Sequence, residues 1–328
     1  MTDWSAECER STEMSLTTPD RFGARSASDV TVRLTSSKRD VKGRAVEWTL
    51  LSTLLISLLI LVALIVNLID RAWPILSGRL GEFLSSGIDA SSATDAGVWQ
   101  AIRGTLILSV IVAIVAFPLG IACAVYLEEY AGKSKVAGLI RINVRNLAGV
   151  PSIVYGILGL TIFVKFAGGL TGGRTVISGG LALSVLVLPV VIITASEALR
   201  AVPRSIREGA LGVGATQWET VRSHVLPSAA PGILTGTVLA LSRAAGEAAP
   251  ILLVGAVTGL LRTGNQSLWT QITEGGFTSM PVAIFSYARQ TGADFQAVTG
   301  AASLILLILV ILINGLAIWL RNRFERSW

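Results

Sequence analysis

The chain contains few of the residues that metal sites and catalytic centres use. Only one histidine, His224, and two cysteines, Cys8 and Cys123, occur among its 328 residues. A metal site or a membrane-embedded catalytic centre needs several His, Cys, Asp or Ser groups gathered at one place, and the sequence shows no such cluster. Cys8 lies in a polar stretch and Cys123 in an apolar one, which does not favour a disulfide. We therefore predict no metal, no bound cofactor and no catalytic residues.

Charged residues are also scarce. They make up 15% of the chain and hydrophobic residues 52%, whereas soluble domains carry about 25% charged residues. This composition is typical of a polytopic membrane protein. The formal net charge is +6. Because Lys and Arg of membrane proteins collect on cytoplasmic loops, this excess is better explained by membrane topology than by an acidic binding partner. No basic patch interleaved with aromatic residues is present, and we predict no nucleic-acid partner.

The beginning of the chain lacks any sustained apolar stretch. Residues 1–45 are rich in Ser, Thr, Asp and Arg, and such a segment cannot bury enough surface to offset its chain entropy. The first apolar stretch begins near Trp48, too late for a cleavable signal peptide, whose apolar region falls within about the first 30 residues. We predict a disordered cytoplasmic tail over 1–45 and a transmembrane domain over 46–328.

Long apolar runs dominate the rest of the chain. A spanning helix needs about 20 apolar residues, and six runs qualify. An even number of spans places both termini on one side of the membrane. The Lys and Arg residues that flank the first and last runs predict that this side is the cytoplasm of a bacterial cell with a multi-pass protein in its plasma (inner) membrane. The six predicted spans are residues 48–69, 101–127, 147–166, 176–195, 231–259 and 299–320.

Four prolines lie inside or at the edges of these runs: Pro118, Pro151, Pro189 and Pro250. Each removes a backbone hydrogen bond, so each can kink or break a helix. Broken helices in membranes occur where protein or water covers the freed carbonyls, as in a translocation path. Kinks that only improve helix packing are the alternative interpretation.

The chain has no phosphate-binding loop. The nearest candidate is Gly132-Lys133-Ser134. A phosphate-binding loop requires a further glycine five positions before that triplet and a preceding strand. Leu127 occupies the glycine position, at the end of an apolar run. We interpret Lys133 as a cytoplasmic loop residue and predict that this chain does not hydrolyse ATP.

A charged segment between the fourth and fifth predicted spans carries two helix-start signals. Ser205 precedes Glu208 by three residues, and Thr216 precedes Glu219 by three. In a capping box of this spacing, the hydroxyl and the carboxylate satisfy the free amides of a helix N-terminus. The spacing therefore predicts two short helices on the cytoplasmic surface.

The residues between and after these two helices predict how they are joined. Gly212 and Gly214 can adopt positive φ and turn the chain sharply, while Pro227 lacks the amide needed to extend the second helix. We predict a helical hairpin over residues 205–223 that serves as a docking element.

The same segment resembles the coupling loop by which permease subunits of ATP-binding-cassette importers dock into their ATPase. The matching residues are Glu208-Gly209-Ala210, Gly214 and Leu226-Pro227. Two positions depart from the family pattern: Gly209 replaces an alanine and His224 a branched aliphatic residue. The resemblance implies that Glu208, Gly209, Ala210, Gly214, Leu226 and Pro227 form the ATPase contact. Small Gly209 and Ala210 let the helix enter a groove, with Arg204 and Arg207 at its rim.

Three other stretches resemble the A-type permease subunits (PstA) of phosphate importers: residues 146–160, 242–250 and 280–288. The resemblance implies an all-α fold of the type I importer transmembrane domain with six spans. It also implies a second homologous permease (PstC type), two ATPase subunits (PstB type) that bind the ATP, and an extracytoplasmic phosphate-binding protein (PstS type). A permease for molybdate or sulfate and a gradient-driven secondary transporter remain alternatives.

Ser242, Arg243 and Glu247 are the predicted substrate-path residues. Arg243 lies about 12 residues into the predicted fifth span, or roughly 18 Å along a helix, near the bilayer middle. A central charge costs about 2.5–3.5 kcal/mol on insertion scales, so it should face a cavity or a partner. An arginine fork matches the oxygens of phosphate in two-point geometry. Glu247, four residues later, either pairs with Arg243 or leaves it to the substrate and contacts the partner permease or a protonated phosphate oxygen.

Overall fold

The computed structural model describes residues 41–132, 134–256 and 276–324. Every regular element in these ranges is a helix, which confirms the predicted all-α class. Three short elements have the wider π-helical turn. The α-helices are α2 Val41–Gly78, α3 Leu80–Ser85, α4 Trp99–Val125, α5 Lys135–Ala148, α6 Ser152–Gly159, α7 Gly168–Thr171, α8 Val176–Ala201, α9 Arg204–Gly212, α10 Gln217–Thr220, α11 Leu226–Gly246, α12 Ala249–Val254, α14 Met280–Ala288 and α15 Ala293–Phe324. The π-helices are η1 Tyr126–Tyr130, η2 Leu160–Phe166 and η3 Val221–Val225.

The chain divides into two compact units, residues 1–64 and 65–328. The described part of the first unit is the beginning of α2. Its large apolar side chains, such as Leu54 and Leu59, are exposed, which suits contact with lipid or protein. Most of the predicted tail lies outside the described residues, and residues 41–45, assigned to the tail from the sequence, belong to α2.

The structure confirms several membrane spans. Five helices are long and apolar enough to cross a bilayer, and a bent pair raises the number to as many as six. The bent pair joins Lys135–Ala148 to Ser152–Phe166 at 102°, so the helix of the predicted third span, 147–166, begins at Ser152, and the bend lies at the predicted Pro151. The other five are Gly43–Gly78, Trp99–Tyr130, Val176–Ala201, Gln217–Gly246 and Ala293–Trp319.

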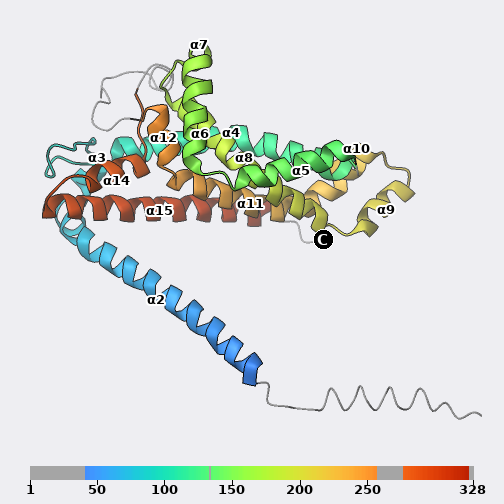
Figure 1. Cartoon of the computed structure of the whole chain (residues 1–328), viewed down its shortest axis with the longest axis horizontal. Helices are drawn as coiled ribbons and strands as arrows, with labels where there is room; N and C mark the ends of the chain where they lie inside the picture. The colour runs from blue at the N-terminus through green and yellow to red at the C-terminus, as the bar shows by residue number, and fades with distance from the viewer. Residues whose placement is uncertain (1–40, 133, 257–275, 325–328) are drawn as a thin grey trace, which may run out of the picture. The chain divides into compact units, whose positions relative to one another are not determined.

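In the second unit, α8 lies between α4 and α11, and α15 packs on α11 (Figure 1). Small residues allow the close approach. A Cβ on Gly120 of α4 would lie 2.6 Å from a Val191 methyl of α8, and one on Gly232 of α11 would lie 2.8 Å from Ala198 Cβ. Small residues at helix contacts are the usual means by which membrane helices pack closely.

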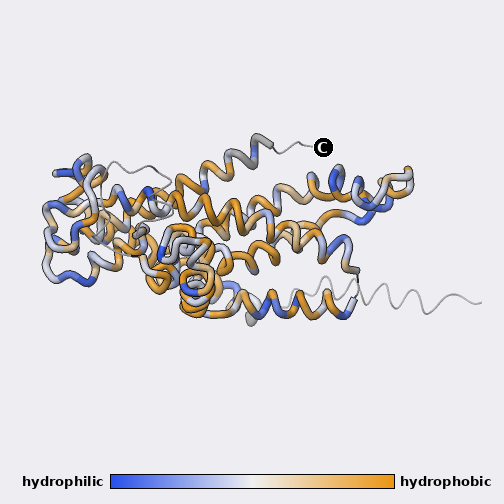
Figure 2. Tube along the Cα trace, turned by 90° about the horizontal axis from the view of Figure 1, so that it is seen from above, coloured by the Kyte–Doolittle hydropathy of each residue, from blue (hydrophilic) through white to orange (hydrophobic). Residues whose placement is uncertain are grey.

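Three of the four hydrophobic clusters in the described residues follow one another along this bundle. The central cluster joins α4, α8, α11 and α12, and each end of the bundle has a cluster of its own. Figure 2 shows hydrophobic residues along the long helices and hydrophilic ones gathered towards the ends. Representative residues are Leu108, Val187 and Ile251 in the centre, Phe83, Met280 and Tyr287 at the α14 end, and Leu199, Val221 and Val225 at the α9–α10 end.

The prolines act in two ways. Pro118 and Pro189 lie inside the continuous helices α4 and α8. Pro151 precedes α6 and Pro250 lies in the first turn of α12, positions where the missing amide costs little. The predicted fifth span over 231–259 is wrong as one continuous helix, because the backbone is extended at Glu247 and a separate helix begins at Ala249; its residues 257–259 lie outside the described ranges.

The helices after these two breaks pack against each other. A Cβ on Gly156 of α6 would lie 2.8 Å from the Cα of Pro250. Glycine at this position is thus required for the backbones of α6 and α12 to touch. The two interruptions therefore belong to one region of the bundle, beside the end of α11.

Candidate functional site

The predicted hairpin is present, and its second helix starts as the sequence indicates. The Thr216 hydroxyl accepts a bond from the Glu219 amide at 3.3 Å, and the Glu219 carboxylate accepts one from the Thr216 amide at 2.8 Å. This is the capping box. The box predicted for Ser205 and Glu208 is wrong, because α9 begins at Arg204 after Pro203 and Ser205 is already inside the helix.

Gly214, and not Gly212, turns the chain between the two helices. Gly214 has φ +92°, and the Ala215 amide donates to the Ala210 carbonyl at 3.1 Å while the Gly214 amide donates to the Leu211 carbonyl at 3.0 Å. These are the two bonds of a Schellman motif, whose left-handed position favours glycine. Gly212 is the last residue of α9, so its predicted role in the turn is wrong.

Pro227 does not end the second helix. Helices α10, η3 and α11 run on without interruption from Gln217 to Gly246. Pro227 lies in the first turn of α11, directly after the wide π turn, where a missing amide is tolerated. His224 lies on η3 with its side chain exposed, so no aliphatic packing is lost at this departure from the family pattern.

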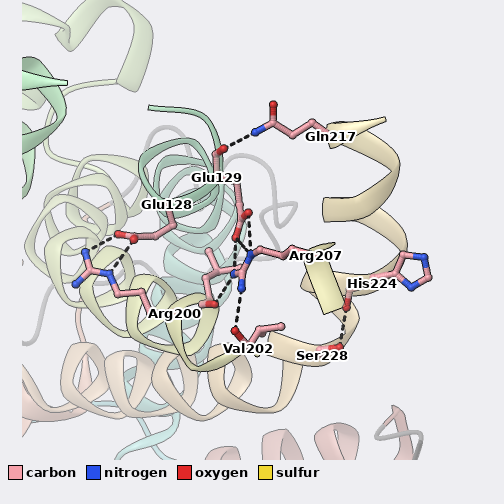
Figure 3. Close-up of polar contacts among 9 residues, drawn as sticks. Glu128, Glu129, Arg200, Val202, Arg207, Gln217, His224 and Ser228 are labelled. Carbon is pink, nitrogen blue, oxygen red and sulfur yellow. Dashed lines mark hydrogen bonds and ion pairs between the residues drawn. The ribbon is translucent and has the colours of Figure 1, made fainter. Parts of the chain in front are cut away.

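Two carboxylates directly after α4 join it to neighbouring helices and to the hairpin, and the sequence analysis missed both. Glu128 lies on η1 and receives two bonds from the Arg200 guanidinium of α8, both 2.7 Å long (Figure 3). Arg141 of α5 approaches the same carboxylate, with Nε 3.5 Å from Oε1. The side chain of Glu128 is only 10% exposed, so these arginines neutralise a charge that is largely withdrawn from water.

The neighbouring Glu129 contacts the hairpin itself. Arg207 of α9 donates to this carboxylate through Nη2 at 2.7 Å and Nε at 3.2 Å, and to the carbonyls of Leu199 and Val202 at 2.8 Å (Figure 3). Gln217 of α10 donates to the Glu129 carbonyl. Arg207 is therefore used within the chain, and its predicted place at the rim of a partner groove is wrong. The sequence did contain a signal for these ion pairs. Two consecutive acidic residues follow an apolar run, and the hairpin segment is rich in arginine.

The surface that the hairpin exposes differs from the predicted one. Glu208, Gly209 and Pro227 are exposed, as a contact surface requires, whereas Ala210 is buried against its own chain. Leu226 packs on the cluster at this end of the bundle. The prediction that Ala210 enters a partner groove is thus wrong. Exposed apolar side chains surround the turn instead: Leu211, Val213 and Trp218.

The second group of predicted residues lies where α11 ends. Arg243 is in the last turn of α11 and Glu247 follows that turn, with 3.5 Å between Arg243 Nε and Glu247 Oε1. The Arg243–Glu247 ion pair, one of the two arrangements considered from the sequence, is therefore present. The Arg243 side chain is 45% exposed, so the pair does not shield it from the surroundings. Ser242 Oγ lies 2.5 Å from Asn314 Oδ1 and thus joins α11 to α15.

The register between α8 and α11 gives the level of Arg243. Gly232 of α11 faces Ala198 of α8, and four residues on, Gly236 faces Thr194, four residues back. The two helices are therefore antiparallel. Seven residues beyond Gly236, Arg243 lies level with Val187, close to the middle of α8. The central bilayer depth inferred from the sequence stays a prediction, and α11 is shorter than predicted.

Residues 116–328 match the family model described as "Binding-protein-dependent transport system inner membrane component". The chain is 33% identical to phosphate transport system permease protein PstA 1 of Mycobacterium tuberculosis (strain CDC 1551 / Oshkosh) over 89% of this chain and 92% of that one. It is also 33% identical to the probable ABC transporter permease protein YqgI of Bacillus subtilis (strain 168), over 70% of this chain and 79% of that one.

Two solved structures share the fold. A chain of a bacterial alginate ABC transporter matches 88% of this chain and 99% of its own length, with a TM-score of 0.53 and 15% identity. A chain of the inward-facing MetNI methionine ABC transporter matches 70% of this chain and 95% of its own, with a TM-score of 0.50 and 19% identity. The bent helices, the capped hairpin and these matches agree, and the chain belongs to the binding-protein-dependent transport system inner membrane component family, with the fold of type I ABC importer permeases.

Proposed function

We propose that this chain is the PstA-type permease subunit of an ATP-driven phosphate importer. Relatives named as phosphate transport permeases support the substrate, since identity to PstA 1 of Mycobacterium tuberculosis extends over 89% of this chain. The single observation that carries the proposal within the structure is Arg243, a charged residue level with the middle of α8 whose side chain is 45% exposed. A charge at that depth needs a polar cavity or a partner.

In this proposal Arg243 binds the phosphate oxygens and Glu247 positions the guanidinium. The pair distance of 3.5 Å is longer than a charge-assisted hydrogen bond, so the arginine retains donors for an oxyanion. A purely structural ion pair is the competing interpretation. It predicts that either single substitution weakens the fold, whereas substrate binding predicts lost uptake in an assembled complex.

The hairpin is the proposed contact with an ATPase subunit. Leu211, Val213 and Trp218 are exposed on a charged element, a composition typical of the apolar centre of a protein interface. The partners are a PstC-type permease, two PstB-type ATPase subunits that bind ATP, and a PstS-type phosphate-binding protein. ATP favours one state of the complex by binding the two states unequally, and the helices then alternate access to the path. Both termini lie in the cytoplasm.

Uptake of radiolabelled phosphate by the four-component complex in proteoliposomes tests this function. We expect ATP-dependent uptake that excess sulfate or molybdate does not inhibit. Arg243→Gln should abolish uptake and leave the amount of co-purified ATPase unchanged, with Arg44→Gln on α2 as a matched control that retains uptake. Inhibition by sulfate or molybdate at equal concentration would assign a different oxyanion, and normal uptake by Arg243→Gln would remove this residue from the path.

A further inference from the structure

The contacts around η1 form one unit, which we call the η1 clamp: Glu128 and Glu129 with Arg141, Arg200 and Arg207. We propose that the η1 clamp transmits movement of the α9–α10 hairpin to helices α4 and α8, with Glu129 and Arg207 as its positioning residues. This inference rests on the proposed docking of an ATPase at the hairpin. It assigns a task to residues that lie outside both the docking surface and the substrate path.

The backbone alone attaches α9 weakly. Between α8 and α9 lie only Val202, with extended backbone, and Pro203. At its other end, α9 passes through the left-handed turn at Gly214. Both connections are non-helical joints, the kind of position at which hinge motion is absorbed. Displacement of the hairpin by a docked ATPase would therefore change the backbone angles at these joints without moving α8, unless side chains hold α9 in place.

Arg207 bridges the joint between α8 and α9 with one planar group. Its guanidinium donates to the Leu199 and Val202 carbonyls at the end of α8 and to the Glu129 carboxylate at the end of α4. The free carbonyls of a helix C-terminus carry partial negative charge, so all of these acceptors favour a cation. The fixed fork of arginine holds them at set angles, which a flexible lysine cannot do. One side chain thus fixes α9 to two long helices at once.

The charges of this bridge are withdrawn from water. The Glu129 side chain is 8% exposed and that of Arg207 is 22% exposed. Exposed ion pairs contribute little and are readily exchanged for water, but a dehydrated, two-point pair is geometrically defined. Removal of one partner would leave the other charge buried without compensation.

The π turn of η1 explains how adjacent acids reach different helices. The Ala131 amide donates to the Tyr126 carbonyl five residues back, at 2.8 Å. Glu128 contacts Arg200 of α8, Glu129 contacts Arg207 of α9, and the Glu129 carbonyl receives Gln217 of α10 (Figure 3). π turns recur at functional sites. Both limbs of the hairpin therefore meet the end of α4 on one short turn.

The test measures coupling in the complete four-component complex in proteoliposomes. Glu129→Gln and Arg207→Gln should each lower the phosphate taken up per ATP hydrolysed at least fivefold, with the amount of bound ATPase unchanged. Arg207→Lys keeps the positive charge but not the planar guanidinium. Its phosphate taken up per ATP hydrolysed should lie between those of the natural protein and Arg207→Gln. The control is Glu197→Gln, which removes an exposed carboxylate from the same end of α8 and should leave the ratio unchanged. An unchanged ratio in both single variants, or a loss of uptake that follows a loss of bound ATPase, would overturn the proposal.

A second measurement does not depend on the substrate. Spin labels at Ser205→Cys on α9, an exposed position outside the proposed ATPase contact, and Leu119→Cys on α4, with Cys8 and Cys123 replaced by Ser, report the distance between the two elements. We expect a narrow distribution that Arg207→Gln broadens at least twofold and Glu197→Gln does not. Equal widths in all three proteins would contradict the clamp. Absence of phosphate uptake by the unmodified complex would instead refute the proposed substrate and leave this measurement valid.

Discussion

The two ends of the bundle in residues 65–328 are held by different forces. At the α14 end, Phe83, Met280 and Tyr287 are fully buried, and two neutral hydrogen bonds join buried groups, while the charged Arg79 donates only to backbone carbonyls of the nearby loop. The Tyr287 hydroxyl donates to the Gly97 carbonyl at 2.6 Å and the Met280 amide to the Thr105 hydroxyl at 2.8 Å. At the α9–α10 end, arginine–carboxylate pairs join the elements in addition to the apolar cluster of Leu199, Val221 and Val225, and apolar side chains around the turn are exposed.

This difference separates a static region from a region suited to movement. Close-packed apolar contacts have one good arrangement and lose much of their energy when shifted. The arginine–carboxylate pairs are directional and their carboxylates are largely withdrawn from water, so they can hold the hairpin as a rigid lever whose outer face is left for a partner. The α14 end therefore fits a fixed support, and the α9–α10 end fits the proposed point where an ATPase acts.

The largest expected effect comes from the α14 end. A Cβ on Gly104 of α4 would overlap the carbonyl oxygen of Thr278, a backbone atom that cannot rotate away. Gly104→Ala should destabilise the protein by about 3 kcal/mol, the upper part of the usual range for overpacking. Thermal unfolding in detergent measures this. Gly138→Ala on α5, where an added Cβ meets nothing within 4 Å, is the control, and equal stability of the two variants would show that the α14 end is not tightly packed.

The next effect concerns the hydroxyl of Tyr287. Tyr287→Phe leaves the Gly97 carbonyl without its donor in a buried position, which costs about 1–3 kcal/mol. Tyr126→Phe, at an exposed hydroxyl, should change stability by much less. The comparison would fail if both substitutions had the same effect.

Alkaline pH should weaken the same contact. Burial raises the pKa of Tyr287 from 10 to about 12. The folded pKa lies above the unfolded one, so the contribution of the neutral tyrosine is complete below about pH 10 and is lost as pH rises through about 12. The stability difference between the natural protein and Tyr287→Phe, measured by urea unfolding at pH 8 and pH 11, should therefore shrink at the higher pH. A difference that grows with pH would contradict the burial of this hydroxyl.

A smaller loss is expected from Arg200→Gln at the α9–α10 end. The Arg200 side chain is 46% exposed and Arg141 still faces Glu128, so solvent screening limits the cost to about 1 kcal/mol. Sodium chloride at 1 M should reduce the difference between the natural protein and this variant. The effect of Tyr287→Phe, a neutral contact, should not change with salt. Equal salt dependence at both ends would remove the distinction between them.

The smallest effect is local. Thr216→Ala removes the hydroxyl that caps α10 and should cost about 0.5 kcal/mol, the lower part of the range for N-caps, because α10 continues into η3 and α11. Hydrogen exchange should quicken at the Glu219 amide, which loses its acceptor. Thr216→Ser should retain the natural rate, and quickening in both variants would exclude the cap as the cause.

Capping and turn patterns predicted those parts of the hairpin whose conformation depends on residues close in sequence. The Thr216–Glu219 capping box and the turn at Gly214 follow from short-range geometry and were predicted correctly. The same rules failed for Ser205, because Pro203 starts the helix two residues earlier. They also failed for Pro227, because the π turn before it lets the helix continue. A spacing pattern does not show which of two nearby residues begins a helix. It also does not show whether a π turn precedes a proline.

Contacts between segments that are distant in sequence could not be predicted from these local patterns. Arg207 was expected to face a partner, but it meets Glu129, 78 residues earlier in the sequence. Ala210 was expected at an interface and is buried against its own chain. Ser242 was expected to face the substrate path, and its hydroxyl lies against Asn314 of α15. Each outcome depends on how α4, α9 and α15 pack.

The order of amino acids alone specifies an all-helical membrane protein and the hairpin with its cap and its turn, because apolar run length and capping depend on residues close in sequence. The tertiary structure alone decides that α11 stops at Gly246 beside the break before α6, and that η1 joins the hairpin to the bundle. Pairing of charges and helix breaks across the fold depends on which distant segments meet, and local sequence does not contain that information.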